Sequence, residues 1–253
     1  MSNSKVAAIT YTVRDFVKTP KDIAASLKKI KAIGYDNVQL SALGPIDPQE
    51  LKSILDGEGL NVCATHENFD RVLNDLDAII AEHHLWGCPN LAIGGLPASY
   101  QNVEGFAKFA EATRAFMPKL ADANLTFSYH NHAWELAKFE GRRALDIMFE
   151  ACDPRVCFEI DTYWIQIGGG DPAAWIRKME NRIPILHLKD MGVSGKEPFM
   201  AEVGEGNLNW PAIFSASQAA GAKWYIVEQD WCAGDPFDSL ALSLRNLKAM
   251  GVT

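Results

Sequence analysis

Short runs of apolar residues recur along the whole chain, and amphipathic stretches separate them. The runs are mostly continuous rather than alternating, which is typical of strands buried on both faces of a parallel sheet. They predict eight strands, at residues 6–13, 37–41, 61–66, 90–94, 125–132, 156–163, 183–189 and 224–229.

The stretches between these runs have the pattern of amphipathic helices. In one of them Ile23, Leu27 and Ile30 recur at the spacing of a single helix face. Gly34 and Gly59 stand where two of the predicted helices should end. Four predicted helices begin with a capping residue followed by a proline suited to a first helical turn. These pairs are Thr19 with Pro20, Asp47 with Pro48, Asp171 with Pro172, and Asp235 with Pro236.

Eight strand–helix units in 253 residues predict an α/β fold, a (β/α)8 barrel that occupies residues 1–253 as a single domain. A doubly wound open sheet would normally have a glycine-rich turn after its first strand. Residues 11–15 read Tyr-Thr-Val-Arg-Asp at that place and contain no glycine. In a barrel, the carboxyl ends of all the strands meet at one mouth, where enzymes with this fold have their active sites.

Three predicted strands end in side chains that commonly bind metals. Asp161, His187 and Glu228 lie at the ends of the sixth, seventh and eighth strands. The alternative roles are a helix-capping acid for Asp161, a core histidine for His187 and a rim carboxylate for Glu228. Their joint position at successive strand ends favours one metal site, with oxygen and nitrogen ligands suited to Mn²⁺, Mg²⁺, Co²⁺ or Zn²⁺.

Further charged residues share strand faces with these three. Glu159 lies on the face of Asp161, and a buried carboxylate is costly unless it is paired or binds a cation. It is therefore either a further ligand or the partner of a base inside the barrel. Lys189 shares the face of His187 and is a candidate for binding a substrate oxygen or acting as an acid, with a surface salt bridge as the alternative.

The end of the fifth strand is dense in polar groups, because residues 129–135 read Tyr-His-Asn-His-Ala-Trp-Glu. His130 and His132 alternate onto one face, and Glu135 follows just beyond them. This density predicts a functional role for the segment, although spacing alone does not decide which member contacts a metal.

Several weaker signals accompany this segment. His66 ends the third strand and is a candidate for substrate contact. Trp164 and Trp231 are candidates for stacking against a sugar, with core packing as the alternative. His83 and His84 lie in a helical pattern and are expected at the surface.

Composition narrows the class of protein. A formal net charge of −8 argues against a protein that binds nucleic acid through phosphate contacts. The five cysteines include no Cys-x-x-Cys pair, which disfavours a disulfide framework or a zinc knuckle. Because the sequence shows neither a signal-peptide pattern nor an apolar stretch long enough to span a membrane, we expect a cytoplasmic protein.

The same segments resemble the xylose-isomerase-like sugar (phosphate) isomerase/epimerase superfamily. They are most similar to its branch with a Tyr-His-Asn-His-x-x-Glu-Phe signature, which includes relatives of inosose dehydratase and 3-keto-sugar isomerases. Here that signature runs from Tyr129 and has Leu136 in place of the final Phe. Other similar segments, in order, are residues 11–15, 161–172, 187–190, 203–210 and 227–230. The resemblance covers nearly the whole chain and implies a (β/α)8 barrel.

The resemblance also implies one divalent cation, expected to be Mn²⁺, held by Glu, Asp, His and Glu. The last three correspond to Asp161, His187 and Glu228. For the first ligand we expect Glu135, with His130 as the alternative, because many relatives have their glutamate where this chain has His130.

The activity implied is metal-assisted proton transfer next to the carbonyl of a ketose or keto-sugar, through an enediolate. Glu135 and Glu228 are expected to move the proton. The residues expected to bind or orient this small-molecule substrate are His66, His130, His132, Trp164 and Lys189.

Three other functions are weighed against this one. A lyase or dehydratase acting on a keto-inositol or a 3-keto-glycoside would share the first chemical step. A nuclease related to abasic-site endonucleases is disfavoured by the acidic charge and the few histidines. A non-catalytic sugar-binding subunit is disfavoured by the intact ligand set. Assembly into a homo-oligomer is left open.

Overall fold

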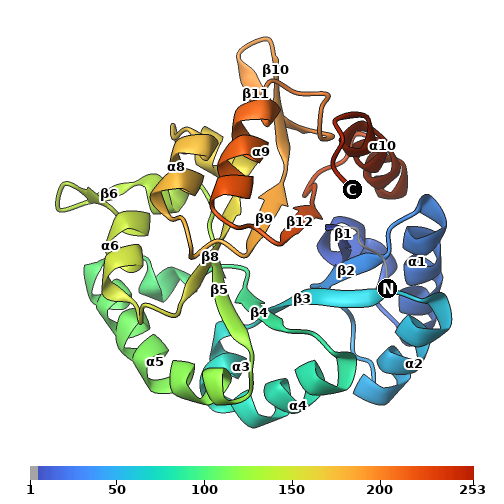
Figure 1. Cartoon of the computed structure of the whole chain (residues 1–253), viewed down its shortest axis with the longest axis horizontal. Helices are drawn as coiled ribbons and strands as arrows, with labels where there is room; N and C mark the ends of the chain where they lie inside the picture. Colours follow the sequence, from blue (N-terminus) through green and yellow to red (C-terminus); the bar gives the residue numbers. More distant parts are fainter. Residues whose placement is uncertain (1–4) are drawn as a thin grey trace.

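The computed structural model describes residues 5–253, and its centre is a closed barrel of eight parallel strands (Figure 1). The order around the barrel is β1-β12-β9-β8-β5-β4-β3-β2. The strands are β1 (Val6–Ile9), β2 (Asn37–Leu40), β3 (Asn61–Glu67), β4 (Asn90–Ile93), β5 (Thr126–His130), β8 (Cys157–Asp161), β9 (Ile185–Leu188) and β12 (Trp224–Val227). The predicted (β/α)8 barrel is confirmed.

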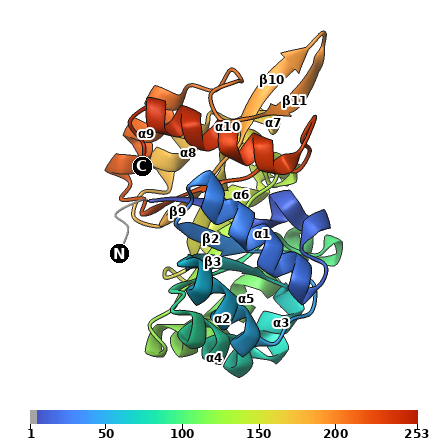
Figure 2. The same cartoon turned by 90° about the vertical axis from the view of Figure 1, so that its right-hand side faces the viewer.

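Helices surround the barrel, and two antiparallel hairpins extend its loops (Figures 1 and 2). The α-helices are α1 (Pro20–Ile33), α2 (Pro48–Glu58), α3 (Phe69–Asn74), α4 (Leu76–Trp86), α5 (Val103–Asp122), α6 (Ala144–Ala151), α7 (Thr162–Ile167), α8 (Pro172–Lys178), α9 (Trp210–Ala219) and α10 (Pro236–Ala249). The short segments are 3-10 helices η1 (Thr10–Phe16), η2 (Ala98–Tyr100) and η3 (Trp134–Leu136), hairpin β6 (Lys138–Phe139) with β7 (Arg142–Arg143), and hairpin β10 (Asp190–Ser194) with β11 (Glu197–Ala201). The β10–β11 hairpin projects away from the body of the molecule (Figure 2). Among the described residues, no helix combines the length and the apolar character needed to cross a membrane.

The predicted helix boundaries are confirmed at the positions that carried the strongest signals. All four prolines stand in the first helical turn, and the preceding Thr19, Asp47, Asp171 and Asp235 each accept a hydrogen bond from a backbone N–H of that turn. Gly34 and Gly59 end α1 and α2 with φ of +113° and +64°. Those left-handed conformations favour glycine because it has no Cβ.

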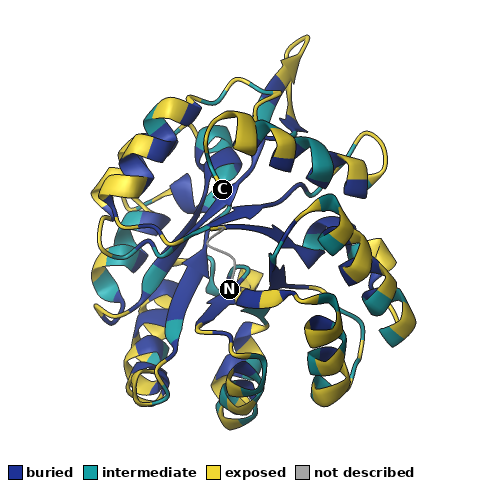
Figure 3. Cartoon of the chain, turned by 45° about the vertical axis from the view of Figure 1, so that its right-hand side comes forward, coloured by how far each residue is buried: buried dark blue, intermediate teal, exposed yellow. Residues whose placement is uncertain are grey.

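Two apolar layers hold the barrel together. The larger one lies between the strands and the surrounding helices, and Figure 3 shows buried strands inside helices whose outer faces are exposed. The smaller one fills the barrel interior and includes Ile185 and Ile226. Two residues further along the same strands, the inward positions are taken by His187 and Glu228. The interior therefore changes from apolar to polar as the strands approach the mouth.

Some predicted boundaries differ from the structure. The first strand ends at Ile9, and residues 10–13 belong to η1. The Thr10 hydroxyl donates to the Ser41 carbonyl oxygen at 2.6 Å and accepts from the Ser41 backbone N–H at 2.7 Å, so a side chain replaces the backbone in pairing with the residue that follows β2. The prediction of a surface His83 was wrong, because this side chain is fully buried between Thr65 and the Cys88 carbonyl.

Candidate functional site

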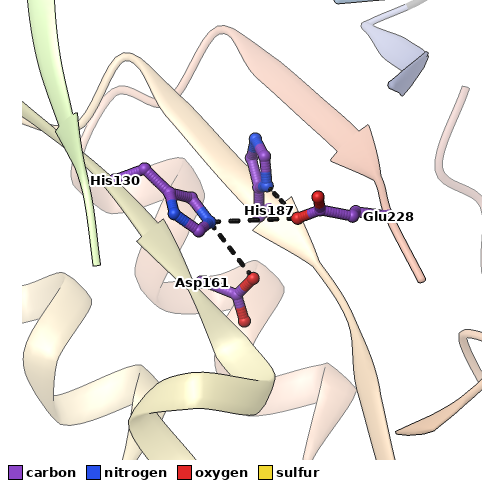
Figure 4. A group of neighbouring side chains, drawn as sticks. All are labelled: His130, Asp161, His187 and Glu228. Atoms are coloured by element: carbon purple, nitrogen blue, oxygen red, sulfur yellow. Dashed lines mark hydrogen bonds and ion pairs between the residues drawn. The ribbon is translucent and has the colours of Figure 1, made fainter. Parts of the chain in front are cut away.

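Four side chains converge at the mouth of the barrel (Figure 4). They are His130 on β5, Asp161 on β8, His187 on β9 and Glu228 directly after β12, and all four are buried. These four strands are consecutive neighbours in the barrel, and Asp161 pairs in register with His187. The sheet itself therefore brings together residues that are far apart in the sequence.

The four side chains fit a single divalent cation. One potential ligand atom from each lies within 4.8 Å of all the others. His130 Nε2 is 3.3 Å from Asp161 Oδ2 and 3.9 Å from Glu228 Oε2, while His187 Nδ1 is 2.7 Å from Glu228 Oε2. Ligands on opposite sides of a cation bound at about 2.1 Å would be about 4.2 Å apart. Small side-chain movements would accommodate such an ion.

His187 is oriented by a second carboxylate behind it. Its Nε2 lies 3.1 Å from Glu159 Oε1 and 2.8 Å from Gln39 Oε1, so its Nδ1 faces Glu228. A carboxylate behind the imidazole is the usual partner of a metal-binding histidine. His66 Nε2 contacts the other Glu159 oxygen at 2.5 Å. Glu159 thus pairs with bases inside the barrel, as one of its two sequence-based interpretations predicts.

Lys189 places an ammonium group among the same carboxylates. Its Nζ is 3.0 Å from both Asp161 Oδ2 and Glu228 Oε2, and 2.9 Å from Asp230 Oδ2. With Glu159 included, the group contains four carboxylates, one ammonium and three imidazoles, those of His66, His130 and His187. The resulting excess of negative charge suits a bound dication.

In this group, burial and neighbouring charges shift the pKa values of the side chains in opposite directions. Burial alone would raise the pKa of Glu228, but Lys189 and His187 outweigh it and hold that pKa well below its usual range. Burial alone would lower the pKa of His187, yet Glu159 and Glu228 raise it to about 10. Without a metal, His187 is therefore protonated at neutral pH, and a bound cation has to displace that proton.

The pKa of His130 is shifted in the opposite direction to that of His187. Burial, followed by the charge of His187, lowers its pKa, so the ring is a neutral imidazole, the form that binds metals. Among residues 5–253 its Nδ1 has no hydrogen-bond partner, and neither has the buried Nε1 of Trp164. Buried polar atoms normally have partners. The ring nitrogen of His130 that faces Asp161 and Glu228 is the other one, Nε2.

Glu135 lies apart from the group of four. Its carboxylate accepts hydrogen bonds from Tyr129 Oη at 2.7 Å and from the His132 backbone N–H at 2.8 Å. Tyr129 precedes His130 and faces the opposite side of β5, among the core side chains between barrel and helices. Burial raises the pKa of Glu135 to about 7. The structure thus brings His130, not Glu135, to Asp161, His187 and Glu228.

A cavity of about 730 Å³ opens above the group of four. All five residues expected to bind substrate line it, namely His66, His130, His132, Trp164 and Lys189. Glu228, Asp230 and Trp231 also line it. Burial, followed by His130, lowers the pKa of His132 to about 3, so this wall presents a neutral imidazole.

Two polar residues of the site, Gln39 and Asp230, were not among those predicted. Gln39 is fully buried within β2, and its amide bridges Glu159 and His187. A polar side chain inside an apolar run costs free energy unless it is paired, and this signal could have identified Gln39. Asp230 follows Glu228 by two residues, the spacing of one strand face.

The sequence was compared with known protein families and with individual proteins. A family described as "Xylose isomerase-like TIM barrel" matches residues 27–250. An inosose dehydratase from Geobacillus thermodenitrificans (strain NG80-2) is 28% identical over 137 residues, a match that covers 47% of this chain and only 45% of that protein.

Two solved structures show the same fold. A sugar phosphate isomerase/epimerase from Parabacteroides distasonis ATCC 8503 has a TM-score of 0.82 at 22% identity, covering 100% of this chain and 96% of that one. An L-ribulose 3-epimerase has a TM-score of 0.73 at 16% identity, covering 98% and 94% of the two chains. At these identities the likeness concerns the fold alone. The family match extends over most of the chain, and the chain therefore belongs to the xylose isomerase-like TIM barrel family.

Proposed function

We propose that the protein is a divalent-metal-dependent sugar isomerase or epimerase. It transfers a proton at the carbon next to the carbonyl of a ketose or keto-sugar, through an enediolate. The observation that carries this proposal is the convergence of His130, Asp161, His187 and Glu228 below a cavity of sugar-binding size.

These four residues would hold the cation, with His130 in the place for which Glu135 was expected. Two imidazoles and two carboxylates suit Mn²⁺, Co²⁺ or Zn²⁺ better than Mg²⁺, which prefers oxygen ligands, and we propose Mn²⁺. When bound, the cation supplies Lewis-acid stabilisation of the negative charge that develops on the substrate's carbonyl oxygen.

The chain's own residues bind the substrate and move the proton. The Glu228 carboxylate is ionised, lines the cavity and is assigned proton removal. Burial, followed by the charge of Glu228, raises the pKa of Asp230 to about 6, so this second carboxyl group at the cavity can take up or release a proton near neutral pH. The Lys189 ammonium and the imidazoles of His66 and His132 orient the substrate's hydroxyl groups. Glu135 positions His132 through its backbone N–H.

A dehydratase acting on a keto-inositol or a 3-keto-glycoside is the second candidate. The likeness to an inosose dehydratase favours it. Both reactions begin with removal of the same proton, and they differ in whether a leaving group is then expelled.

Product analysis in D2O tests the proposal. The protein, loaded with Mn²⁺, is incubated with a panel of ketoses, keto-sugars and keto-inositols and followed by NMR. Deuterium at the carbon next to the carbonyl, together with an isomerised product, is the expected result, and an unsaturated product would establish the dehydratase. Asp161→Asn is the matched control and should abolish either reaction. If the wild-type protein exchanges no proton with any of these substrates, the proposal is wrong.

A further inference from the structure

The cavity above the group of four is larger than one sugar requires. A hexose has about a dozen non-hydrogen atoms, and if each displaced as much volume as a liquid water molecule the sugar would fill about 360 Å³. The cavity measures about 730 Å³. About half of it therefore remains when a single ring occupies the inner end, where Trp164 and Lys189 lie close together.

Trp231 stands at the outer end of this space. Its side chain is 65% exposed, and it lines both the main cavity and an adjoining one of about 240 Å³, together with Arg14 and Asp230. A single exposed aromatic residue is ordinary on a protein surface. This one differs because it lines two cavities, which also share Arg14 and Asp230.

The backbone that carries Trp231 is held in place. Arg14 Nη2 donates to the Asp230 carbonyl oxygen at 2.8 Å, and Gln229 Nε2 donates to the Trp231 carbonyl oxygen at 3.2 Å. The Asp230 side chain is bonded to Lys189. The backbone from which the indole projects is therefore held beside Lys189.

The surroundings of Trp231 have the chemistry of a sugar-binding subsite. The Arg14 guanidinium stacks over the Tyr11 ring at 4.6 Å, and both side chains line the cavity beside Trp231. Aromatic faces accept the apolar face of a sugar ring, while charged groups at their edges bond its hydroxyls. The inner end offers a similar combination in Trp164, His132 and Lys189.

We infer that the outer end of the cavity, formed by Tyr11, Arg14 and Trp231, binds a second sugar ring. The substrate is then a keto-sugar joined to another sugar, rather than a free keto-monosaccharide. The reaction at the inner ring rests on the proposed function, whereas the binding of the outer ring depends only on the shape and chemistry of the cavity.

Paired substrates test this inference. The ratio of kcat/KM for a keto-disaccharide to kcat/KM for the matching keto-hexose is measured for the wild type and for Trp231→Ala. We expect the wild type to favour the disaccharide, and we expect Trp231→Ala to reduce the ratio by roughly three- to tenfold, the size of one lost stacking contact.

Phe199→Ala is the control, since Phe199 is a similarly exposed aromatic residue on β11 that lines none of the cavities described above; it should leave the ratio unchanged. A keto-hexose with an aromatic aglycone forms a third arm, and a preference for it over the disaccharide would overturn the assignment to a sugar.

Equilibrium binding separates failure of this inference from failure of the proposed function. Calorimetric titration of the Mn²⁺-loaded protein uses a disaccharide without a keto group and its parent monosaccharide. Tighter binding of the disaccharide that depends on Trp231 would support the outer subsite even if no substrate is turned over. Equal affinities, or equal kcat/KM values for the two keto-sugars, would overturn it even if proton exchange is observed.

Discussion

At the scale of single residues, His187 links the candidate metal site to the polar network behind it. Its Nδ1 faces Glu228, and its Nε2 faces Glu159 and Gln39. Glu159 therefore acts on a bound metal only through the imidazole, by fixing its orientation and increasing its basicity.

Replacing Glu159 with Gln should weaken metal binding without removing a ligand. We expect the affinity for Mn²⁺ to fall by about 10- to 100-fold, the usual effect of losing the carboxylate behind a metal-binding histidine. Titration of the metal-free protein with Mn²⁺, followed by electron paramagnetic resonance, measures the change. An unaltered affinity would show that Glu159 has no influence on the site.

A substitution of Glu135 tests whether this residue positions His132 or moves the proton itself. Because its carboxylate is bonded to Tyr129 and to the His132 backbone, we expect Glu135→Gln to lower kcat by less than about tenfold, whereas loss of a general acid or base typically costs 10² to 10⁴. The measurement is kcat with bound metal quantified in the same sample. A loss of a thousandfold with metal retained would return Glu135 to the catalytic role that the sequence suggested.

His83 should make the protein sensitive to acid. Its Nδ1 lies 3.0 Å from the Cys88 carbonyl oxygen and so donates to it, which leaves Nε2 to accept from Thr65, and burial lowers its pKa to about 4. The unfolded chain binds this proton at its ordinary pKa of about 6.5, so the stability due to neutral His83 is present above that pH and is lost as the pH falls towards 4. At about pH 5 the loss is about 2 kcal/mol relative to pH 7.5.

Urea unfolding at these two pH values measures this effect. His83→Gln should reduce the difference in unfolding free energy between them by about 2 kcal/mol. His84→Gln, which removes the neighbouring exposed imidazole of α4, is the control. If His83→Gln and the wild type show the same pH dependence, the buried neutral imidazole is not the cause.

The sequence predicted the members of the candidate metal site correctly where their position at the end of a strand is enough to bring them to the barrel mouth. Asp161, His187 and Glu228 each end an apolar run, and barrel closure is enough to bring such ends together. The fourth member was ambiguous between Glu135 and His130. The hydrogen bond from Tyr129 to Glu135 depends on packing outside the barrel, which spacing along the chain does not reveal.

At the scale of elements, continuous apolar runs predicted the strands because both faces of the barrel wall are buried. Proline and capping residues likewise predicted helix starts, since their effect is local. Strand ends were less predictable. At Asp161 the carboxylate caps α7 by accepting from the Trp164 backbone N–H at 3.0 Å, so the helix begins directly at Thr162.

Asp190, near the end of β9, forms hydrogen bonds with the segment that follows the β10–β11 hairpin. Its buried carboxylate accepts hydrogen bonds from the Trp210 indole at 2.7 Å, and from the backbone N–H groups of Met191, Gly204, Gly206 and Leu208. A single side chain therefore satisfies five donors, which explains how a long connection at the mouth is held in one conformation.

Asp190→Asn should loosen this segment. The amide has one acceptor oxygen instead of two and adds donors, so buried N–H groups lose their partner at a cost of about 2–3 kcal/mol. Urea denaturation measures the loss, and hydrogen exchange should show faster exchange at residues 203–210 than in the barrel strands. A change below about 0.5 kcal/mol would contradict this account, since surface substitutions without structural roles have effects of that size.

At the scale of the whole molecule, the residues that stabilise the fold are different from those that form the candidate active site. The apolar residues inside the barrel and the layer beneath the helices hold the strands together, while the charged groups gather at the mouth. The four candidate ligands come from four neighbouring strands between residues 130 and 228, so no local segment contains the site. The candidate metal site can therefore form only when these four strands have paired.

The most direct measurement is anomalous X-ray scattering from crystals of the protein soaked with Mn²⁺. We predict a single strong peak within bonding distance of His130, Asp161, His187 and Glu228, with Lys189 displaced from the carboxylates that it contacts in the present structure. The matching crystals of Asp161→Asn should show no peak. A wild-type crystal in which this place carries no anomalous signal, or in which the ion is held by other residues, would contradict the central claim.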